Sequence, residues 1–305
     1  MATLTPHRYL IVIAGPTGSG KTQKAIQLAK AYDTSVISAD ARQFYAEIPI
    51  GTAAPTAAEL TAAKHHFVGH LSIFDAFDAG LFADTTVELL ETLFLENDHV
   101  LLCGGSGLFI KAVTDGLDTL PDVPAEIREQ VRALYSEHGL SRLQQEVAQR
   151  DPHYFAHADT HNPQRLMRAL EICLATGKTF SEFRAGKPVP RSFVPIRICL
   201  EIPREELYQH INDRVDRMME AGLLEEARKV HAHRHLPALQ TVGYKELFDH
   251  FDGRYDLGTA IDLIKQHSRN YAKRQLTWFR NTGGYHMVHP QLVDPGYIDY
   301  LKSRQ

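Results

Sequence analysis

The segment GPTGSGKT, residues 15–22, contains the residue types and spacing that point most directly to chemistry. It matches G-x-x-x-x-G-K-[ST], in which glycines let backbone N–H groups turn inward around a phosphate. The lysine adds a positive charge, and the threonine hydroxyl is a ligand for Mg²⁺. The pattern therefore predicts a phosphate-binding loop, without specifying ATP, that consists of Gly15, Pro16, Thr17, Gly18, Ser19, Gly20, Lys21 and Thr22.

Asp40 is a second candidate, because it follows the short strand-like segment SVISA at residues 35–39. Three roles fit a carboxylate at this place. The first role is to hold magnesium, as a Walker B aspartate does. The second is to act as a general base toward a bound substrate, and the third is to cap the N-terminus of a following helix. The spacing alone leaves these alternatives open.

A third strand-like segment, Val100–Cys103, ends in Gly104, Gly105 and Ser106 and carries no carboxylate. The missing carboxylate argues against a motor or switch ATPase. The Gly-Gly-Ser sequence either offers amides and a hydroxyl to a diphosphate or simply forms a tight turn.

These residues must be positioned by a parallel sheet. Strand-like Tyr9–Ala14 precedes the phosphate loop, and helical patterns cover residues 21–32, 85–95 and 107–113. Strands alternating with helices indicate βαβ units. Ligands of such sheets bind outside the carboxyl ends of the strands, so Asp40 and the loop should share one rim.

The pattern changes near residue 117. Residues 121–187 show helical spacing only, at 125–138, 141–150 and 162–176, and the proline-rich 188–195 reads as a linker. A strand is expected at 196–202, followed by helices at 205–233 and 259–279. The sequence thus predicts an α/β P-loop core, residues 1–118 and 190–305, with a parallel sheet flanked by helices. An all-helical insertion domain, residues 119–189, interrupts it.

Composition narrows the class of protein. The 305 residues are 44% hydrophobic with a net charge of −4, as in a folded globular protein. No apolar run predicts a membrane span, and three widely spaced cysteines form no disulfide or metal pattern, so a cytoplasmic protein is expected. The negative net charge by itself argues against a nucleic-acid-binding protein.

Seven segments in order identify a resemblance that reaches from Gly15 to about Asn281. They resemble the tRNA dimethylallyltransferases, also called the isopentenyl-tRNA transferase family. The segments are GPTGSGKT, SADARQFYAEIPIGTAAP, GGSGLFIKA, NPQRLMRALEICLATGK, RVDRMMEAGLLEEAR, LQTVGYKELF and YAKRQLTWFRN.

That family transfers a dimethylallyl group from dimethylallyl diphosphate to N6 of adenosine 37, beside the anticodon of tRNA. The resemblance implies that the phosphate loop holds this diphosphate with Mg²⁺ on Thr22, and that Asp40 is the general base. Lys21, Thr22, Ser106 and Arg214 would act with it at the reaction centre, although Arg214 alone would read as a solvated side chain. The implied tRNA-binding residues are Asp40, Ala41, Arg42, Gln43, Ser106, Arg128, Gln164, Arg165, Leu166, Met167 and Arg168.

The chemistry fits these assignments. An adenine amine is a poor nucleophile, so a carboxylate that accepts its proton assists attack. Diphosphate leaves when cations neutralise its charge. The base must leave its stack, and the insertion domain would grip the anticodon stem-loop. The implied partners are therefore tRNA and dimethylallyl diphosphate, for a monomer without membrane association.

Four positions depart from the family pattern. Ser106 replaces the usual Thr and keeps the hydroxyl, whereas Phe109 replaces Tyr and loses one. Ala54 replaces a Lys and removes a positive charge, and Asn162 replaces an Asp.

Three other functions are alternatives for this sequence: a small-molecule kinase with ATP in the loop, a prenyltransferase of free adenine nucleotides, and a non-catalytic RNA-binding protein. Intact Lys21, Thr22 and Asp40 argue against the last. The helical insertion favours a macromolecular acceptor. So does a basic stretch in which Lys265, Arg269 and Lys273 share one helix face, either as a phosphate-backbone contact or as a solvated surface.

Overall fold

The computed structural model describes residues 8–184, 186 and 189–304, which form two compact units. One unit combines the residues up to Asp115 with those from Pro190 onward, and the other runs from Gly116 to Val189. None of the helices in these described ranges combines the length and apolar character needed to cross a bilayer.

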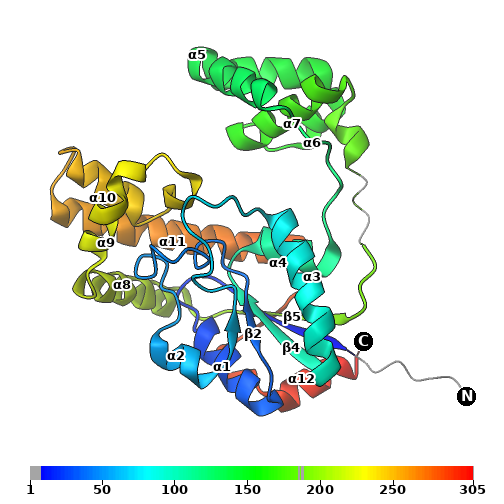
Figure 1. Cartoon of the computed structure of the whole chain (residues 1–305), viewed down its shortest axis with the longest axis vertical. Coiled ribbons are helices and arrows are strands. Elements are labelled where there is room, and N and C mark those ends of the chain that lie inside the picture. The colour runs from blue at the N-terminus through cyan, green and yellow to red at the C-terminus, as the bar shows by residue number, and fades with distance from the viewer. Residues whose placement is uncertain (1–7, 185, 187–188, 305) are drawn as a thin grey trace, which may run out of the picture. The chain divides into compact units, whose positions relative to one another are not determined.

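The first unit is built on a parallel sheet with the strand order β3-β2-β4-β1-β5-β6 (Figure 1). Every pair of neighbouring strands in it is parallel. The central strands are continuous apolar runs because helices cover both faces. The strands are β1 (Tyr9–Ala14), β2 (Val36–Ser38), β3 (His65–His66), β4 (His99–Gly104), β5 (Val194–Leu200) and β6 (His286–Val288).

Alternate residues of β1 serve the two faces of the sheet. Leu10 and Val12 pack with α3 (Ala79–Glu96) and α4 (Gly107–Asp115), while Ile11 and Ile13 pack with α1 (Lys21–Tyr32) and α12 (Pro295–Lys302). The predicted α/β architecture, a parallel sheet flanked by helices, is confirmed.

The C-terminal half of this unit adds a helical cluster, and here one prediction is wrong. A single helix was expected over 205–233, but it divides into α8 (Arg204–Glu220) and α9 (Leu223–Val230). Gly222 lies between them with φ 99°, a conformation that ends a helix. The cluster is completed by α10 (Tyr244–Phe251) and α11 (Leu257–Thr282).

The predicted linker at 188–195 begins at a residue outside the described ranges, and its last two residues, Val194 and Pro195, already belong to β5. Pro195 is tolerated inside the strand because β5 pairs there with β1 alone, and β6 joins only from Ile198 onward. A residue without an N–H can occupy such an unpaired side.

The second unit contains α5 (Ala125–Arg150), α6 (Pro152–His157), α7 (Pro163–Thr176) and the 3₁₀ turn Phe180–Phe183. The two helices predicted at 125–138 and 141–150 meet at Gly139, whose φ of 70° bends α5. Short elements were not predicted: β3, β6, α6, α10, α12, α2 (Ala57–Ala62) and the 3₁₀ turns at His231–His233, Pro237–Leu239 and Pro290–Leu292.

Candidate functional site

The phosphate loop connects β1 to α1 as predicted, and its glycines adopt conformations that other residues avoid. Gly15 has φ 148°, and a Cβ atom there would lie 2.9 Å from the Leu200 carbonyl oxygen. Gly18 and Gly20 have φ values of 85° and 82°. Because Gly20 caps α1 without a side chain, the first N–H groups of that helix face no capping side-chain acceptor. Such a helix N-terminus favours an anion.

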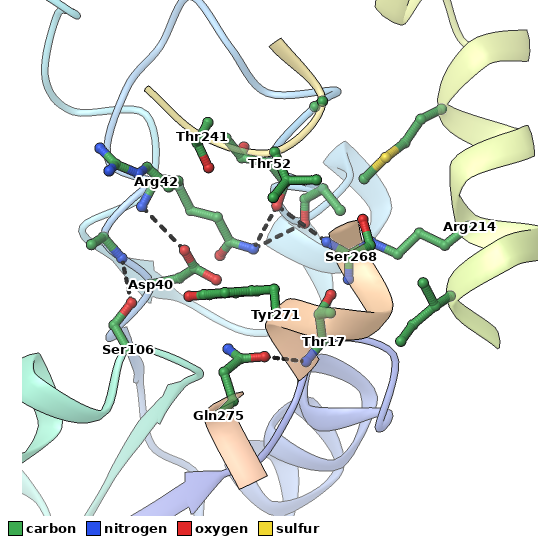
Figure 2. Close-up of a pocket in the computed structure, with 18 of the residues that line it drawn as sticks. Thr17, Asp40, Arg42, Thr52, Ser106, Arg214, Thr241, Ser268, Tyr271 and Gln275 are labelled. Atoms are coloured by element: carbon green, nitrogen blue, oxygen red, sulfur yellow. Dashed lines mark hydrogen bonds between the residues drawn. The ribbon is translucent and has the colours of Figure 1, made fainter. Parts of the chain in front are cut away.

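Gln275 of α11 braces the phosphate loop against the Gly-Gly-Ser turn (Figure 2). Its Oε1 accepts a hydrogen bond from the Thr17 N–H at 2.9 Å, and its Nε2 donates to the Gly105 carbonyl at 2.9 Å. A Cβ atom on Gly105 would lie 2.3 Å from that Nε2. The glycine is therefore required by close packing. Sequence reasoning did not assign Gln275 a role, although it lies in the recognised segment YAKRQLTWFRN.

Asp40 lies at the carboxyl end of β2, on the same rim as the phosphate loop. Its Oδ1 accepts a hydrogen bond from the Arg42 N–H at 3.1 Å, which closes a local turn. No helix begins there, so the helix-cap alternative is wrong. Ser106 Oγ accepts from the Ala41 N–H at 3.0 Å and ties this turn to the end of β4.

One cavity of about 460 Å³ brings the candidate residues of the first unit together. Thr17, Lys21 and Thr22 line it with Asp40 and Ser106, and the segment Ala41–Gln43 and Arg214 lie in the same wall. Apolar side chains form another part of the lining, namely Ile211, Val215, Met218, Leu223, Val242 and Ile264. A polar, charged zone thus adjoins an apolar one.

Enclosure in the cavity destabilises the charged forms of its basic groups. Enclosure lowers the pKa of Lys21, and the negative charge of Asp40 partly offsets this by raising it. Enclosure likewise lowers the pKa of Arg214, again opposed by Asp40. An anionic ligand would relieve this destabilisation by supplying the negative charge that both cations lack.

Two neutral groups also face the cavity. Burial raises the pKa of Cys103 to about 12, so its thiol is no ready nucleophile at neutral pH. Enclosure first, and then the charge of Asp40, raise the pKa of Tyr271 to about 12. Its ring lies beside Asp40 in Figure 2 and keeps its proton there.

The turn around Thr52 orients two cavity side chains. The Thr52 carbonyl accepts a hydrogen bond from Arg214 Nη2 at 3.4 Å and one from Gln43 Nε2 at 3.3 Å. The Ala53 carbonyl accepts from the same Gln43 amide at 3.0 Å. Arg214, whose sequence context alone suggested a solvated side chain, is therefore directed into the cavity.

A buried carboxylate fixes this turn from behind. Glu226 of α9 accepts hydrogen bonds from the N–H groups of Ile50 and Gly51 at 2.9 and 2.8 Å. It also accepts one from the Tyr244 hydroxyl at 2.5 Å. Tyr244 is fully buried, and a Cβ on Gly51 would lie 2.4 Å from its hydroxyl. Sequence reasoning missed this support, because its partners are 175 residues apart in the chain.

In the second unit, the side chains expected to contact tRNA divide into two groups. Arg128, Gln164 and Arg165 are exposed, and Arg168 pairs with Glu171 at 3.3 Å. Leu166 and Met167 instead pack in the core of the helical unit. The helix turns these two side chains inward, and the contact of Leu166 and Met167 with tRNA stays a prediction.

The basic face of α11 is also different from the prediction. Lys265 forms an ion pair with Asp216 of α8 at 2.6 Å, and Arg269 donates to Asn212 at 2.7 Å. These two cations therefore stabilise the packing of α8 on α11, and only Lys273 of the three is exposed.

Two of the departures from the family pattern have local explanations. Phe109 packs against Phe44 and Phe82, with ring centroids 5.7 and 5.4 Å apart, so it needs no hydroxyl partner. Asn162 caps α7 by accepting a hydrogen bond from the Arg165 N–H at 3.2 Å, as an aspartate would.

Comparisons with known proteins agree with this arrangement. A family model described as IPP transferase matches residues 43–282. The tRNA dimethylallyltransferase of Christiangramia forsetii is 47% identical over 296 residues, 97% of this chain and 98% of that protein. The tRNA dimethylallyltransferase 1 of Bacteroides thetaiotaomicron is 45% identical over 96% of this chain and 95% of its own. The crystal structure of the full-length tRNA isopentenylpyrophosphate transferase from Bacillus halodurans superimposes with a TM-score of 0.70 at 33% identity, covering 97% and 95% of the two chains.

Proposed function

The chain belongs to the IPP transferase family, and on that premise we propose that it transfers a dimethylallyl group from dimethylallyl diphosphate to N6 of adenosine 37 in tRNA. It is a prenyltransferase of tRNA modification. The observation that supports this most directly is the single cavity shared by the phosphate loop, Asp40 and Arg214. The comparisons favour RNA prenylation over the kinase and free-nucleotide alternatives. The reported relatives are all named as tRNA dimethylallyl or isopentenyl transferases, and none of them is named as a kinase or as a prenyltransferase of free nucleotides.

The diphosphate would occupy the N-terminus of α1. Thr17, Lys21 and Thr22 of the loop line the cavity there, and Arg214 approaches from α8. Both cations have a lowered pKa because of enclosure, so a diphosphate is the ligand that stabilises their charged forms. As the leaving group gains negative charge, these groups stabilise it without reorganising.

The residues present fit a magnesium ion that arrives with the diphosphate. The described residues contain no group of three or more His, Cys, Asp or Glu side chains arranged to hold a metal. Magnesium needs few protein ligands when phosphate oxygens and water complete its octahedron. Thr22 would contribute its hydroxyl, as phosphate-loop threonines do. When bound, the ion neutralises part of the charge on the leaving group.

The transfer itself forms one bond and breaks one. The adenine N6 forms a bond to C1 of the dimethylallyl group, and the C1–O bond breaks so that diphosphate leaves with the electron pair. Asp40 accepts the proton that N6 releases, which prevents charge from accumulating on the amine. The apolar lining formed by Ile211, Val215, Met218, Leu223, Val242 and Ile264 suits the five-carbon group.

The RNA partner would be the anticodon stem-loop. Adenosine 37 must leave its stack to reach Asp40, and the exposed Arg128, Gln164 and Arg165 of the helical unit are suited to hold the RNA. The helical unit, residues 119–189 of the predicted division, is thus proposed as the tRNA-binding domain. The three cysteines are free, which fits the reducing cytoplasm. A monomer is proposed with it.

Ligand preference tests the proposal. With Mg²⁺ present, dimethylallyl diphosphate should raise the melting temperature of the protein, because it binds the folded state only. Lys21→Met should remove most of this shift. If ATP raises the melting temperature and dimethylallyl diphosphate does not, the phosphate loop serves a kinase and the proposal is wrong.

A further inference from the structure

Among the described residues of the first unit, a buried carboxylate lies outside the cavity lining and has no cationic partner. It belongs to Glu226 of α9, which is 7% exposed, and no ion pair joins it to a basic side chain in those ranges. Removing a lone carboxylate from water is costly unless hydrogen bonds replace its hydration. Here the donors are the N–H groups of Ile50 and Gly51 and the Tyr244 hydroxyl. The carboxylate in turn fixes the backbone at residues 50 and 51.

The turn that Glu226 holds is strained. Ala53 has φ 46°, a left-handed conformation that residues other than glycine rarely adopt. Such a conformation persists only where the surrounding structure holds it. The Ala53 N–H donates a hydrogen bond to the Ile50 carbonyl at 3.0 Å, and Glu226 holds the N–H of the same Ile50. Glu226 therefore anchors the turn whose Thr52 and Ala53 carbonyls accept hydrogen bonds from side chains of the cavity.

Arg214 depends on this turn for its direction (Figure 2). The Thr52 carbonyl oxygen, 3.4 Å from its Nη2, is the one hydrogen-bond acceptor that the guanidinium contacts among the described residues. The charge of Asp40 raises the pKa of Arg214 but, within those residues, the two side chains form no ion pair. A guanidinium presents its N–H groups as a planar fork, so its orientation decides how many of them reach an anion. A shift of the Thr52 carbonyl would therefore redirect Arg214.

We propose that Glu226 is a positioning residue for the transfer reaction. By holding residues 50–53 from outside the cavity, it sets the direction in which Arg214 donates hydrogen bonds to the diphosphate. The inference rests on the proposed function, because it takes the diphosphate as the ligand of Arg214. Glu226 does not line the cavity, so it acts on the diphosphate only through the turn and Arg214. Gln43, the other side chain held by this turn, is expected at the RNA and does not enter a measurement made without RNA.

Asp151 of the helical unit provides a matched control. It is 1% exposed and, like Glu226, it accepts hydrogen bonds from two backbone N–H groups and one hydroxyl, which belong to Tyr154 and Ser181. Replacing either carboxylate by its amide therefore removes a buried charge of the same kind. In both cases the amide must turn its NH₂ group toward a donor. Glu226 is the one of the two that holds the Thr52 turn.

The experiment measures binding of inorganic diphosphate with Mg²⁺ to the full chain by calorimetry, at a temperature where each variant is folded. The proteins are wild type, Glu226→Gln, Arg214→Lys, the combination of these two substitutions, and Asp151→Asn. Loss of one hydrogen bond to a charged group corresponds to about tenfold in affinity. We therefore expect Glu226→Gln to bind diphosphate about tenfold more weakly than wild type, and Asp151→Asn to bind it as wild type does.

The combined variant shows whether Glu226 acts through Arg214. In the Arg214→Lys background, Glu226→Gln should cause little further loss of affinity, because a lysine ammonium lacks the planar fork that the turn directs. Tyr244→Phe covers the case in which Glu226→Gln does not fold. It removes one of the three hydrogen bonds to the same carboxylate and should weaken diphosphate binding less, again only where Arg214 is present.

Three results would overturn the inference. Wild-type affinity in folded Glu226→Gln would show that Arg214 does not depend on the turn. Equal losses in the wild-type and Arg214→Lys backgrounds would show that Glu226 acts through general packing, and an equal loss for Asp151→Asn would show that any buried carboxylate has this effect. Failure of the proposed function is distinguishable, because it appears in a different measurement, the transfer of the prenyl group to RNA by the wild-type chain.

Discussion

Replacing Asp40 by Asn removes the proposed base while it preserves the local backbone. The hydrogen bond from the Arg42 N–H to Asp40 Oδ1, 3.1 Å long, can be kept by the amide oxygen of Asn. The neutral side chain cannot accept the proton from N6. Positioned general bases contribute about 10²- to 10⁴-fold to rate, equivalent to about 3–5.5 kcal/mol in the barrier. We therefore expect single-turnover prenyl transfer to slow by that factor.

Binding should respond in the opposite direction. Asp40 is the one carboxylate among the described cavity residues, and it repels an incoming diphosphate. Its removal should leave inorganic diphosphate binding equal or tighter, although the pKa values of Lys21 and Arg214 lose the upward influence of its charge. The assay follows prenylated RNA with enzyme in excess, and calorimetry measures the diphosphate affinity.

The combination of the two measurements is decisive. A large loss of rate with intact binding supports proton acceptance at Asp40. A rate within threefold of wild type would refute the role of Asp40 as the base, and a parallel loss of rate and diphosphate affinity would indicate a binding role.

Three further predictions concern the groups around the base. Tyr244→Phe removes a hydrogen bond to the buried Glu226 carboxylate. The free energy of unfolding should therefore decrease by about 2 kcal/mol, and the melting temperature should fall by about 4–8 °C. An unchanged melting curve would contradict the account of that contact. Gly105→Ala places a Cβ 2.3 Å from Gln275 Nε2, so calorimetry should show weaker diphosphate binding but little change in RNA binding, and equal losses of both would point to general misfolding. Enclosure lowers the pKa of Lys21, and only the protonated form of this side chain attracts diphosphate. As the pH rises, the affinity for diphosphate should therefore begin to decline at a lower pH than it would with a lysine of ordinary pKa. Lys21→Arg should shift that decline to higher pH, and coincident pH profiles would show that Lys21 does not control it.

Features encoded within one stretch of chain were predictable from the sequence. The phosphate loop, its strand and its helix follow from glycine spacing and an apolar run, and the predicted break between the helical patterns at 125–138 and 141–150 falls at Gly139. The parallel sheet follows from the alternation of strands and helices. The short strands β3 and β6 could not be predicted, since two or three residues carry no periodicity.

Features that depend on distant partners were not predictable. The helical spacing of Lys265 and Arg269 placed them correctly on one face, but their partners Asp216 and Asn212 belong to another helix. Arg214 reaches the cavity because the Thr52 carbonyl, 162 residues away in the chain, accepts its hydrogen bond. Such contacts exist only after the sheet brings the segments together.

The net charge of −4 led to a wrong expectation for a related reason. It averages over acidic surface far from the site, whereas the cavity alone has a large excess of cations. Local charge, which the fold creates, decides which polyanion binds.

The central claim is tested most directly by mass analysis of the RNA product. Unmodified tRNA is incubated with the protein, dimethylallyl diphosphate and Mg²⁺, and its anticodon-loop fragments are then sequenced by mass. The account predicts that one dimethylallyl group is added to adenosine 37. An unmodified loop, or a group attached at another nucleotide, would contradict it.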